Sequence, residues 1–252
     1  MNTPLVSVVM PTHNYGRYIG RAIEGILSQT YERFELIVVD DASTDNTAEV
    51  VGRYEDDRIV LLRREECGCS GVLARNDGLA VAKGDLIAAA DADDISVRQR
   101  LALQVDFLGR YPEVDVLGGG VIPIDEKGRP LGGPTFMPVL DRLEDYRRWF
   151  LMGRGAVLHG TVVFRRRVLE KLRGYHDCIS SGDFEFLLRA SRYFQLYNLR
   201  KVLIYRRRHE ASVTRTAGRL LKRHYHRIFT IREYLWVQEE VRRLAREQGR
   251  EG

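Results

Sequence analysis

The sequence predicts an α/β fold, with a mostly parallel, Rossmann-like sheet flanked by helices and a basic, helical C-terminal extension. The first observation is that short apolar runs alternate with amphipathic stretches in the first part of the chain, as in successive β-α-β units. The second is that the run Leu86–Ala90 is apolar at consecutive positions, which is typical of a strand covered by helices on both faces. The third is that polar residues directly follow three of the four runs. Ligands of open α/β sheets bind beyond the carboxyl ends of the strands, so one edge of this sheet is expected to carry the chemistry.

The first half of the chain provides four strands and three helices. Apolar residues at Ile19, Ala22, Ile23 and Ile26 have the spacing of one helix face. Gly84 is well placed to stop the third helix. The predicted strands are Leu5–Met10, Phe34–Val39, Ile59–Leu62 and Leu86–Ala90, and the predicted helices run from Tyr18 to Leu27, from Thr47 to Tyr54 and from Val72 to Ala82.

The second half alternates helices and strands less regularly. Pro112 ends a helix whose Leu101 and Leu108 share one face, and the run Gly118–Gly120 is expected to bend the strand that follows. The predicted helices are Leu101–Tyr111, Asp141–Met152, Arg167–Leu172, Asp183–Ser191 and a tail from about Arg219 to Glu247, and the predicted strands are Val114–Ile124, Gly160–Phe164 and Val202–Tyr205.

The composition is that of a soluble globular protein. The 252 residues are 44% hydrophobic and 30% charged, which is enough to bury a sizeable core. No apolar run approaches the roughly 18–20 residues that span a bilayer, and the N-terminus lacks the basic region of a signal peptide. Cys67, Cys69 and Cys178 are too few for a disulfide framework or a zinc site, and indicate free thiols in a reducing cytoplasm.

Positive charge is concentrated at the C-terminal end. The chain has a net charge of +5, while residues 201–252 hold 14 Lys and Arg against 6 Asp and Glu, a balance of +8. The first 200 residues therefore carry −3. Such a tail is usually a solvated helical face, but it also suits contact with an anionic membrane surface, a partner or a second copy of the chain. Nucleic acid is not expected as a partner, because the tail has no recognised nucleic-acid motif.

The stretch Asp85–Asp94 gives the strongest chemical signal. Its apolar run ends in three carboxylates, Asp91, Asp93 and Asp94. These would repel one another unless a cation lay among them, and hard cations such as Mg²⁺ or Mn²⁺ prefer oxygen ligands. The alternative is an acidic surface turn, which is the commoner origin of an isolated D-x-D. The preceding strand favours a metal site that holds a diphosphate.

Four motifs follow one another along the chain: VSVVMPTHN, ELIVVDDASTDNT, ARNDGLAVAKGDLIAAADADD and SGDFEFLLR. In this order and spacing they resemble the family 2 glycosyltransferases of the GT-A fold, over roughly residues 5–210. The resemblance implies an inverting, hexosyltransferase-type enzyme that moves a sugar from a nucleotide-activated donor to a hydroxyl acceptor. It implies a GT-A domain over residues 1–212, with a nucleotide-binding half at 1–97 and an acceptor-binding half at 98–212, and a helical extension at 213–252.

The resemblance also implies roles for individual residues. Asp93 and Asp91 would hold a divalent ion, Mn²⁺ or Mg²⁺. Asp183 would be the base that takes the proton of the acceptor hydroxyl, because a single displacement needs only one carboxylate. The residues that would contact the donor are Pro11, Thr12, His13, Asp41, Arg75, Asp91 and Ala92. Those that would line the acceptor side or lie near the diphosphate are His159, Gly160 and His209.

Several of these residues have a structural alternative. Asp41 and Asp183 both stand where an aspartate commonly caps a helix. The alternative for Arg75 is an arginine on the exposed surface of a helix. Asp94 is expected to cap the turn that follows it. Glu185, two residues beyond Asp183, is expected to point elsewhere on a helix.

Two other functions fit the same fold class. A sugar-1-phosphate nucleotidyltransferase would have a Gly-rich loop after the first strand, whereas PTHNYG has one glycine at its end. A catalytically silent, nucleotide-binding scaffold would not need its acids intact. The favoured interpretation is a cytoplasmic transferase that uses a UDP-sugar and a saccharide or lipid-linked acceptor. Its basic tail suits peripheral contact with the inner face of the membrane or a homodimer.

Overall fold

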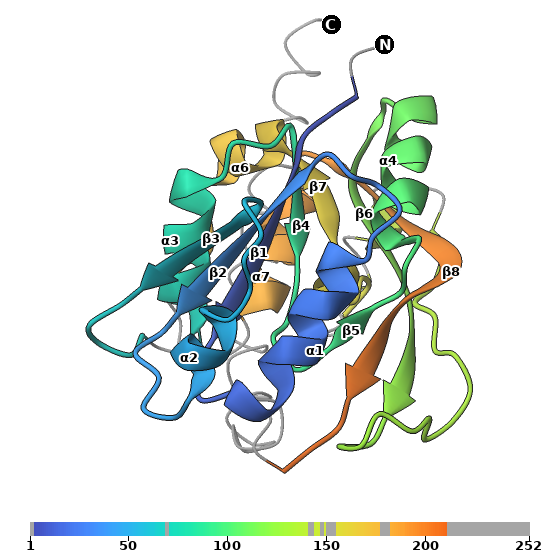
Figure 1. Cartoon of the computed structure of the whole chain (residues 1–252). Helices are drawn as coiled ribbons and strands as arrows, with labels where there is room; N and C mark the ends of the chain where they lie inside the picture. The colour runs from blue at the N-terminus through green and yellow to red at the C-terminus, as the bar shows by residue number, and fades with distance from the viewer. Residues whose placement is uncertain are drawn as a thin grey trace, which may run out of the picture.

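The structure of the chain is a computed structural model that describes residues 3–68, 71–140, 144–146, 149, 155–176 and 182–210. Within these residues, eight strands form one sheet in the order β3-β2-β1-β4-β7-β6-β8-β5 (Figure 1). Four of the seven strand pairings are parallel, those of β1 with β2, β1 with β4, β2 with β3 and β6 with β8. The predicted α/β architecture is confirmed.

The first half of the chain forms the parallel part of the sheet as predicted. Strands β1, β2 and β4 are mostly buried because helices cover both faces of the sheet, while the edge strand β3 is half-buried. The strands are β1 (Val6–Thr12), β2 (Phe34–Asp40), β3 (Ile59–Arg63) and β4 (Leu86–Ala89), and the helices are α1 (Gly16–Leu27), α2 (Thr47–Val51) and α3 (Val72–Val81).

The second half adds an antiparallel part. Strand β7 pairs antiparallel with both β4 and β6, and the two-residue β5 pairs antiparallel with β8. The strands are β5 (Ile95–Ser96), β6 (Val114–Ile124), β7 (Val163–Arg165) and β8 (Gln195–Arg207), and the helices are α4 (Arg100–Arg110), η2 (His159–Thr161), α6 (Arg166–Leu172) and α7 (Gly182–Ala190).

This half differs from the prediction in three places. The predicted strand Gly160–Phe164 begins as the 3₁₀ turn η2 and becomes extended only at β7. Strand β8 is longer than Val202–Tyr205, and β5 is an additional strand. The predicted helix Asp141–Met152 lies largely outside the described residues, and the tail lies wholly outside them, as do Cys69 and Cys178.

Strands β6 and β8 shift register at the glycine run. A Cβ atom at Gly118 would lie 2.4 Å from a methyl of Val157, and one at Gly120 would lie 2.3 Å from the ring of Phe136. Only glycine allows the chain this close approach. The predicted bend is present as a register shift between Gly118 and Val121.

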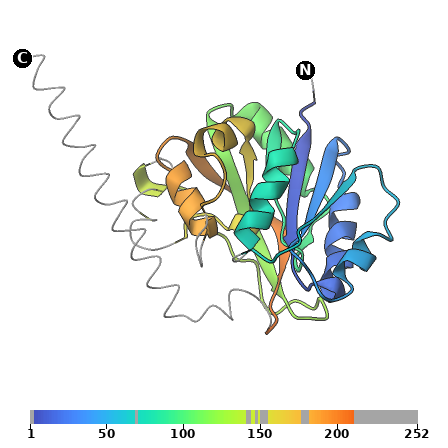
Figure 2. The ribbon, with the colours of Figure 1, turned by 90° about the vertical axis from the view of Figure 1, so that its left-hand side faces the viewer.

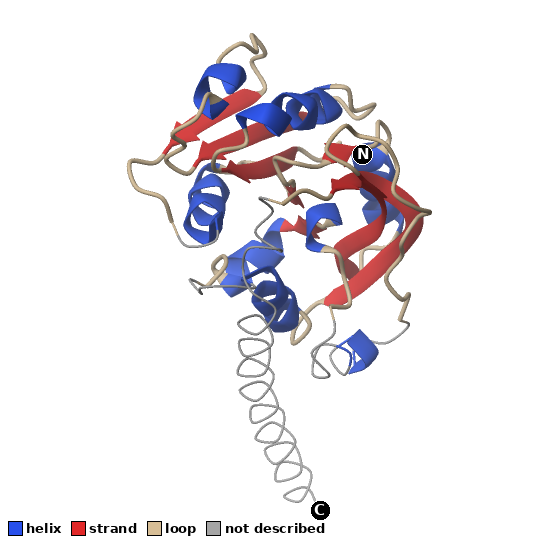
Figure 3. Ribbon diagram, turned by 90° about the horizontal axis from the view of Figure 1, so that it is seen from below, coloured by secondary structure: helices blue, strands red, loops and turns tan. Residues whose placement is uncertain are grey.

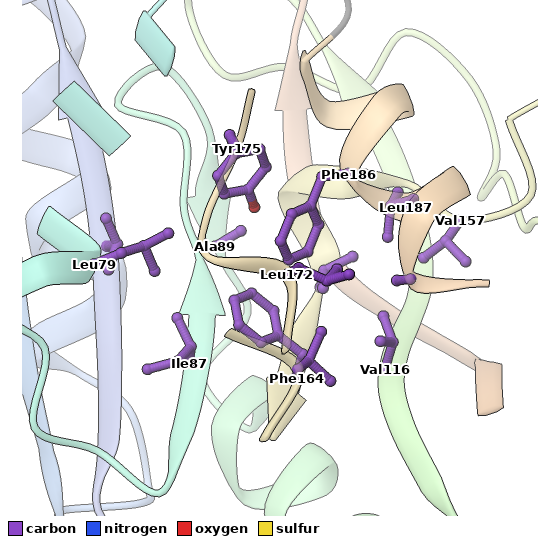
Figure 4. Packing of buried hydrophobic residues seen from close by; sticks show 14 of the residues in the cluster. Leu79, Ile87, Ala89, Val116, Val157, Phe164, Leu172, Tyr175, Phe186 and Leu187 are labelled. Carbon is purple, nitrogen blue, oxygen red and sulfur yellow. The ribbon is translucent and has the colours of Figure 1, made fainter. Parts of the chain in front are cut away.

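Two apolar clusters lie on the two faces of the sheet because alternate residues of each strand point in opposite directions. Val9 belongs to the cluster shared with α3, α6 and α7, and Val8 belongs to the cluster shared with α1, α2 and α4. Figure 2 shows helices on either side of the strands, and Figure 3 shows the same layers from below. Figure 4 shows the first cluster, where Phe164 of β7 lies near Phe186 of α7.

The sheet brings its polar strand ends together. Thr12 at the end of β1 pairs with Asp40 at the end of β2, and Val9 pairs with Ala89 at the end of β4. The three loops that follow these strands therefore leave the same edge. Of the helices that the structure describes, none is both long and apolar enough to cross a membrane.

Candidate active site

The loops after β1 and β2 are bonded to each other. The Nδ1–H of His13 donates to the Asp41 carbonyl at 2.7 Å, and its Nε2 accepts from the Asn14 amide at 3.1 Å. Asn14 and Ala42 both adopt a left-handed conformation, with φ of 56°. Both imidazole nitrogens of His13 are therefore engaged in hydrogen bonds within the protein. The ring can pack against a ligand but has no free nitrogen with which to act as a base. Pro11 and Thr12 end β1 beside it.

Asp41 is buried, with 2% of its surface exposed, and it anchors the loop after β3. Its Oδ1 accepts from the Gly68 main-chain N–H at 2.9 Å and lies 2.8 Å from Nε of Arg64. Helix capping is not the role of Asp41, because α2 begins only at Thr47; the neighbouring Asp40 accepts from the Ser43 N–H at 3.1 Å and so stabilises the turn before that helix. The contact of Asp41 with a nucleobase stays a prediction.

The three carboxylates after β4 form one cluster. The Asp94 N–H donates to the Asp91 carbonyl at 3.2 Å, and buried Ala92 lies inside this turn. Burial and repulsion from Asp93 and Asp91 raise the pKa of Asp94 well above its usual range. The same three carboxylates add to burial in raising the pKa of the Tyr15 phenol. The cluster therefore has an excess of negative charge.

Strand β8 closes the cluster from the other side. The Arg207 main-chain N–H donates to Oδ1 of Asp94 at 2.8 Å, so this carboxylate is bonded to β8 and not, as predicted, to the turn that follows it. Its partner is supplied by a strand more than a hundred residues away, which local sequence does not reveal. Nε2 of His209 lies 2.8 Å from Oδ2 of Asp93, and its buried Nδ1 has no hydrogen-bond partner among the described residues. His209 thus contacts a predicted metal ligand.

Two arginines face the cluster. Nη2 of Arg75 lies 3.3 Å from Oδ1 of Asp91, and its buried Nε has no hydrogen-bond partner in the described part of the chain. Arg100 is fully buried behind the cluster, where it donates to the Ala89 carbonyl at 2.7 Å. Burial lowers the pKa of Arg100 to about 10, and the carboxylates of Asp91 and Asp94 oppose this shift. Arg75 therefore lies against the acid cluster, its contact with the base or the diphosphate stays a prediction, and Arg100 was missed.

The residues present fit a divalent cation by the chemistry of their donor atoms. No group of three or more His, Cys, Asp or Glu side chains in the described ranges is arranged as a complete cage. Asp91 and Asp93 nevertheless present hard oxygen donors that are 36% and 16% exposed, beside the buried carboxylate of Asp94. A hard cation prefers such ligands and would offset their mutual repulsion.

Gly160 lies against this cluster from η2. A Cβ atom at this position would lie 2.7 Å from Oδ2 of Asp91 and 3.6 Å from Oδ2 of Asp94. The preceding residue, His159, is buried, and its Nε2 is hydrogen-bonded to the Tyr175 hydroxyl at 2.7 Å. Burial, with help from Arg75, lowers the pKa of His159 to about 4, although the carboxylates of Asp183 and Asp91 oppose the shift.

Asp183 is exposed in the first turn of α7, where its Oδ1 accepts from the Phe184 N–H at 2.8 Å. Helix α7 packs through Phe186 on the Tyr175 ring, and Tyr175 is bonded to His159 beside the acid cluster. Glu185 is instead buried in an ion pair with Arg189, as its helical spacing predicts. Glu185 therefore has a structural role.

Tyr175 joins the donor side of the site to α7, and sequence reasoning missed it. The Asn76 amide of α3 bonds both the N–H and the carbonyl of Tyr175 at 2.8 Å. The Tyr175 ring stacks on Phe186 of α7, with ring centroids 4.3 Å apart (Figure 4). The guanidinium of Arg75 lies 5.3 Å from the same ring.

The buried His159 predicts a pH dependence of stability. Its ordinary pKa is 6.5 and its folded pKa is about 4, so only the unfolded chain takes up this proton as pH falls through that window. Stability is therefore full above pH 6.5 and falls toward pH 4, by up to about 3 kcal/mol. Gln at this position cannot titrate, so urea unfolding of His159→Gln should show a shallower slope between pH 7 and pH 4.5. Identical slopes for the two proteins would refute the buried neutral imidazole.

The curled α/β sheet, with an acid cluster after β4 and α7 across from it, has the architecture of a GT-A glycosyltransferase. The chain belongs to glycosyl transferase family 2, whose model matches residues 7–173. It is 34% identical over 208 residues to the putative glycosyltransferase EpsE of Bacillus subtilis, and these residues cover 79% of this chain and 72% of EpsE. The chain is thus a glycosyltransferase, and the predicted family and enzyme class are confirmed.

Two further similarities concern donor and acceptor. Over 105 residues the chain is 38% identical to the Escherichia coli UDP-Glc:alpha-D-GlcNAc-diphosphoundecaprenol beta-1,3-glucosyltransferase WfaP, which covers 41% of each protein. The fold of the chain is also similar to that of the mannosyltransferase PcManGT of Pyrobaculum calidifontis, whose structure was solved in complex with GDP-Man and Mn²⁺. The TM-score is 0.67 and the sequence identity is 23%, and the match covers 93% of this chain and 65% of PcManGT. The chain spans less than two thirds of either protein.

Proposed function

We propose that this glycosyltransferase moves a sugar from a nucleotide diphosphate, with UDP favoured, to a hydroxyl acceptor by an inverting single displacement. The observation that carries the proposal is a chain of contacts that runs from Asp91 through Arg75 and Tyr175 to Phe186 of α7, the helix whose first turn holds Asp183. This chain supports a site with a guanidinium for the diphosphate and an exposed carboxylate for the acceptor. WfaP, which uses a UDP-sugar by name, supports UDP as the nucleotide.

The loops after β1, β2 and β3 are proposed to hold the nucleoside. His13 fixes the first two loops to each other, and Asp41 fixes the third through Gly68 and Arg64. Arg75 is proposed to reach the diphosphate, since its Nε is buried and has no partner among the described residues. A guanidinium suits phosphoryl oxygens because its N–H groups form a planar fork.

Asp93 and Asp91 are proposed to hold Mn²⁺ or Mg²⁺. Such an ion, when bound, neutralises the diphosphate and stabilises negative charge on the leaving group. His209 orients the Asp93 carboxylate through the contact at Oδ2. The Mn²⁺ in the PcManGT complex supports this assignment.

Asp183 is proposed as the general base. It is exposed at the start of α7, so an acceptor hydroxyl has access to it. His159 is a poor alternative because it is buried and its Nε2 is taken by Tyr175. A single carboxylate suffices for an inverting displacement.

A saccharide or a lipid-linked saccharide is proposed as the acceptor. WfaP acts, by name, on a diphosphoundecaprenol-linked sugar. The +8 balance of residues 201–252 suits peripheral contact with an anionic membrane surface or a dimer contact. The GT-A domain is proposed to end at residue 212 and the helical extension to begin at residue 213. Flotation with anionic liposomes tests the membrane contact, and equal flotation of a chain lacking residues 213–252 would refute it.

Calorimetric titration of UDP, GDP and dTDP, with and without Mn²⁺, tests the donor site. We expect UDP to bind wild type at least tenfold more tightly with Mn²⁺. The ion should make no difference in Asp93→Ala, because that variant lacks the proposed ligand. Asp106→Asn is the control, since this exposed carboxylate pairs only with Arg110 among the described residues. Absence of nucleotide binding by folded wild type would refute the proposed donor site.

A further inference from the structure

A second pocket is lined by residues from the start of α1, from the turn that follows β6 and from the carboxyl end of β8. Figure 1 shows where these elements lie in the fold. The volume of the pocket is about 250 Å³, which is enough for a phosphoryl group and some water. The residues that line this basic pocket are Arg17, Tyr18, Arg21, Glu126, Lys127 and Arg207. Every side chain but one carries a charge, so the pocket is suited to an ionic ligand.

The basic pocket has more positive than negative charge. Four of its side chains are cationic and one is a carboxylate, which leaves a formal balance of +3. Oε2 of Glu126 lies 3.1 Å from Nη1 of Arg17 and neutralises that one arginine. Nη1 of Arg21 donates to the main-chain carbonyl of Lys127 at 3.2 Å, so these two residues are neighbours in the lining of the basic pocket. Neither Arg21 nor Lys127 has a carboxylate partner in the described part of the chain.

Arg207 is held rigidly in the wall of the basic pocket. It is 4% exposed, and its Nε and Nη1 donate to three main-chain carbonyls, those of Asp93, Asp125 and Glu126, at 2.8–3.0 Å. Its Nη2 has no acceptor among the described residues. A guanidinium fixed in this way loses little freedom when it binds an anion, and phosphoryl oxygens match its geometry.

The basic pocket lies apart from the proposed donor site. Its wall is formed by Tyr18, over whose ring the Arg207 guanidinium lies at 5.0 Å from the centroid. The His209 ring lies 4.8 Å from the same Tyr18 ring and contacts Asp93 on the side of the acid cluster. Helix α1 also packs on the opposite face of the sheet from α3 and α7, which carry Arg75 and Asp183.

We propose that the basic pocket binds a phosphoryl anion in addition to the donor, either free phosphate or the phosphate of a lipid headgroup. The excess charge attracts the anion, and Arg207 with Arg21 supplies N–H donors for its oxygens. Arg207 also bonds the Asp94 carboxylate and the Asp93 carbonyl. An anion held by Arg207 is therefore linked to the acid cluster through this one residue.

Calorimetry with inorganic phosphate in EDTA tests the basic pocket without metal or donor. We expect saturable binding by wild type, at least tenfold weaker binding by Arg21→Gln and Lys127→Gln, and wild-type binding by Arg110→Gln. Arg110 is the matched control because it is an exposed arginine on α4, far from the pocket lining and paired with Asp106. No saturable binding, or equal loss in Arg110→Gln, would overturn the proposal.

Vesicles distinguish the two sources of the phosphate. If the source is a headgroup, phosphatidylglycerol vesicles should retain the full chain more strongly than phosphatidylcholine vesicles, and Arg21→Gln should reduce that retention while Arg110→Gln does not. If the source is free phosphate, retention should be equal for both variants while calorimetric binding depends on Arg21. Arg21→Gln should keep Mn²⁺-dependent UDP binding while it loses phosphate binding in EDTA, so failure of the donor site and failure of the basic pocket give different results.

Discussion

Asp183→Asn is expected to lower kcat by about 10²–10⁴-fold, while nucleotide affinity stays within about twofold of wild type. An amide oxygen can still accept the Phe184 N–H that Oδ1 of Asp183 accepts at 2.8 Å, so the first turn of α7 should keep its bond. What the amide cannot do is take the proton of an acceptor hydroxyl. The loss should therefore appear in the chemical step and not in binding. Nucleotide release from the donor, with water or a simple glycoside as acceptor, measures it.

Two comparisons separate catalysis from helix capping. Unfolding of Asp183→Asn should match wild type, because the cap is kept. Glu185→Gln should instead lower the unfolding temperature, because it weakens a buried ion pair with Arg189 in the same helix. If Asp183→Asn keeps its kcat, or loses stability and activity together, Asp183 is a capping residue and the base lies elsewhere.

The parallel part of the fold was predictable because its signals are local. The strand Leu86–Ala89 is apolar at consecutive positions, and turn residues separate the predicted strands from the helices. Strand β5 was missed because Ile95–Ser96 is too short to show a period. The first residues of β8 were missed because exposed Arg200 and Lys201 interrupt its apolar pattern, while pairing with β6 holds the strand together.

The site was predictable where its residues directly follow strands. Asp41, Asp91 and Asp93 reach the same edge because parallel strands end together. Arg64 shared that signal, since it follows β3 directly, but was overlooked. Arg100 depends on tertiary packing, although one clue was available in its neighbour Gln104.

Gln104 lies on the buried stripe between Leu101 and Leu108, a position where a polar residue signals a buried polar network. It accepts from Nε of Arg100 at 3.3 Å and donates to the carbonyls of Leu117 and Thr161. No comparable clue pointed to Tyr175, because a single tyrosine after Gly174 does not differ from a tyrosine that only packs in the core.

Gly160→Ala is the second change expected to have a large effect. Its added methyl would lie 2.7 Å from Oδ2 of Asp91, so either that carboxylate or the η2 turn must move. A shift of this size at a proposed metal ligand is expected to weaken Mn²⁺-dependent nucleotide binding by about tenfold or more, and to lower activity by about 10²-fold. Calorimetry with UDP and Mn²⁺, and the nucleotide-release assay, measure the two effects.

Gly109→Ala is the matched control, because a methyl at Gly109 of α4 would meet nothing within 4 Å. That variant should keep both activities and unfold at or slightly above the wild-type temperature, since alanine stabilises a helix interior relative to glycine by about 1 kcal/mol. In Gly160→Ala, phosphate binding at the basic pocket should persist, because Tyr18 and Arg207 separate it from the change. Unaltered Mn²⁺ dependence in Gly160→Ala would mean that Asp91 is not a metal ligand, and would leave Asp93 to hold the ion.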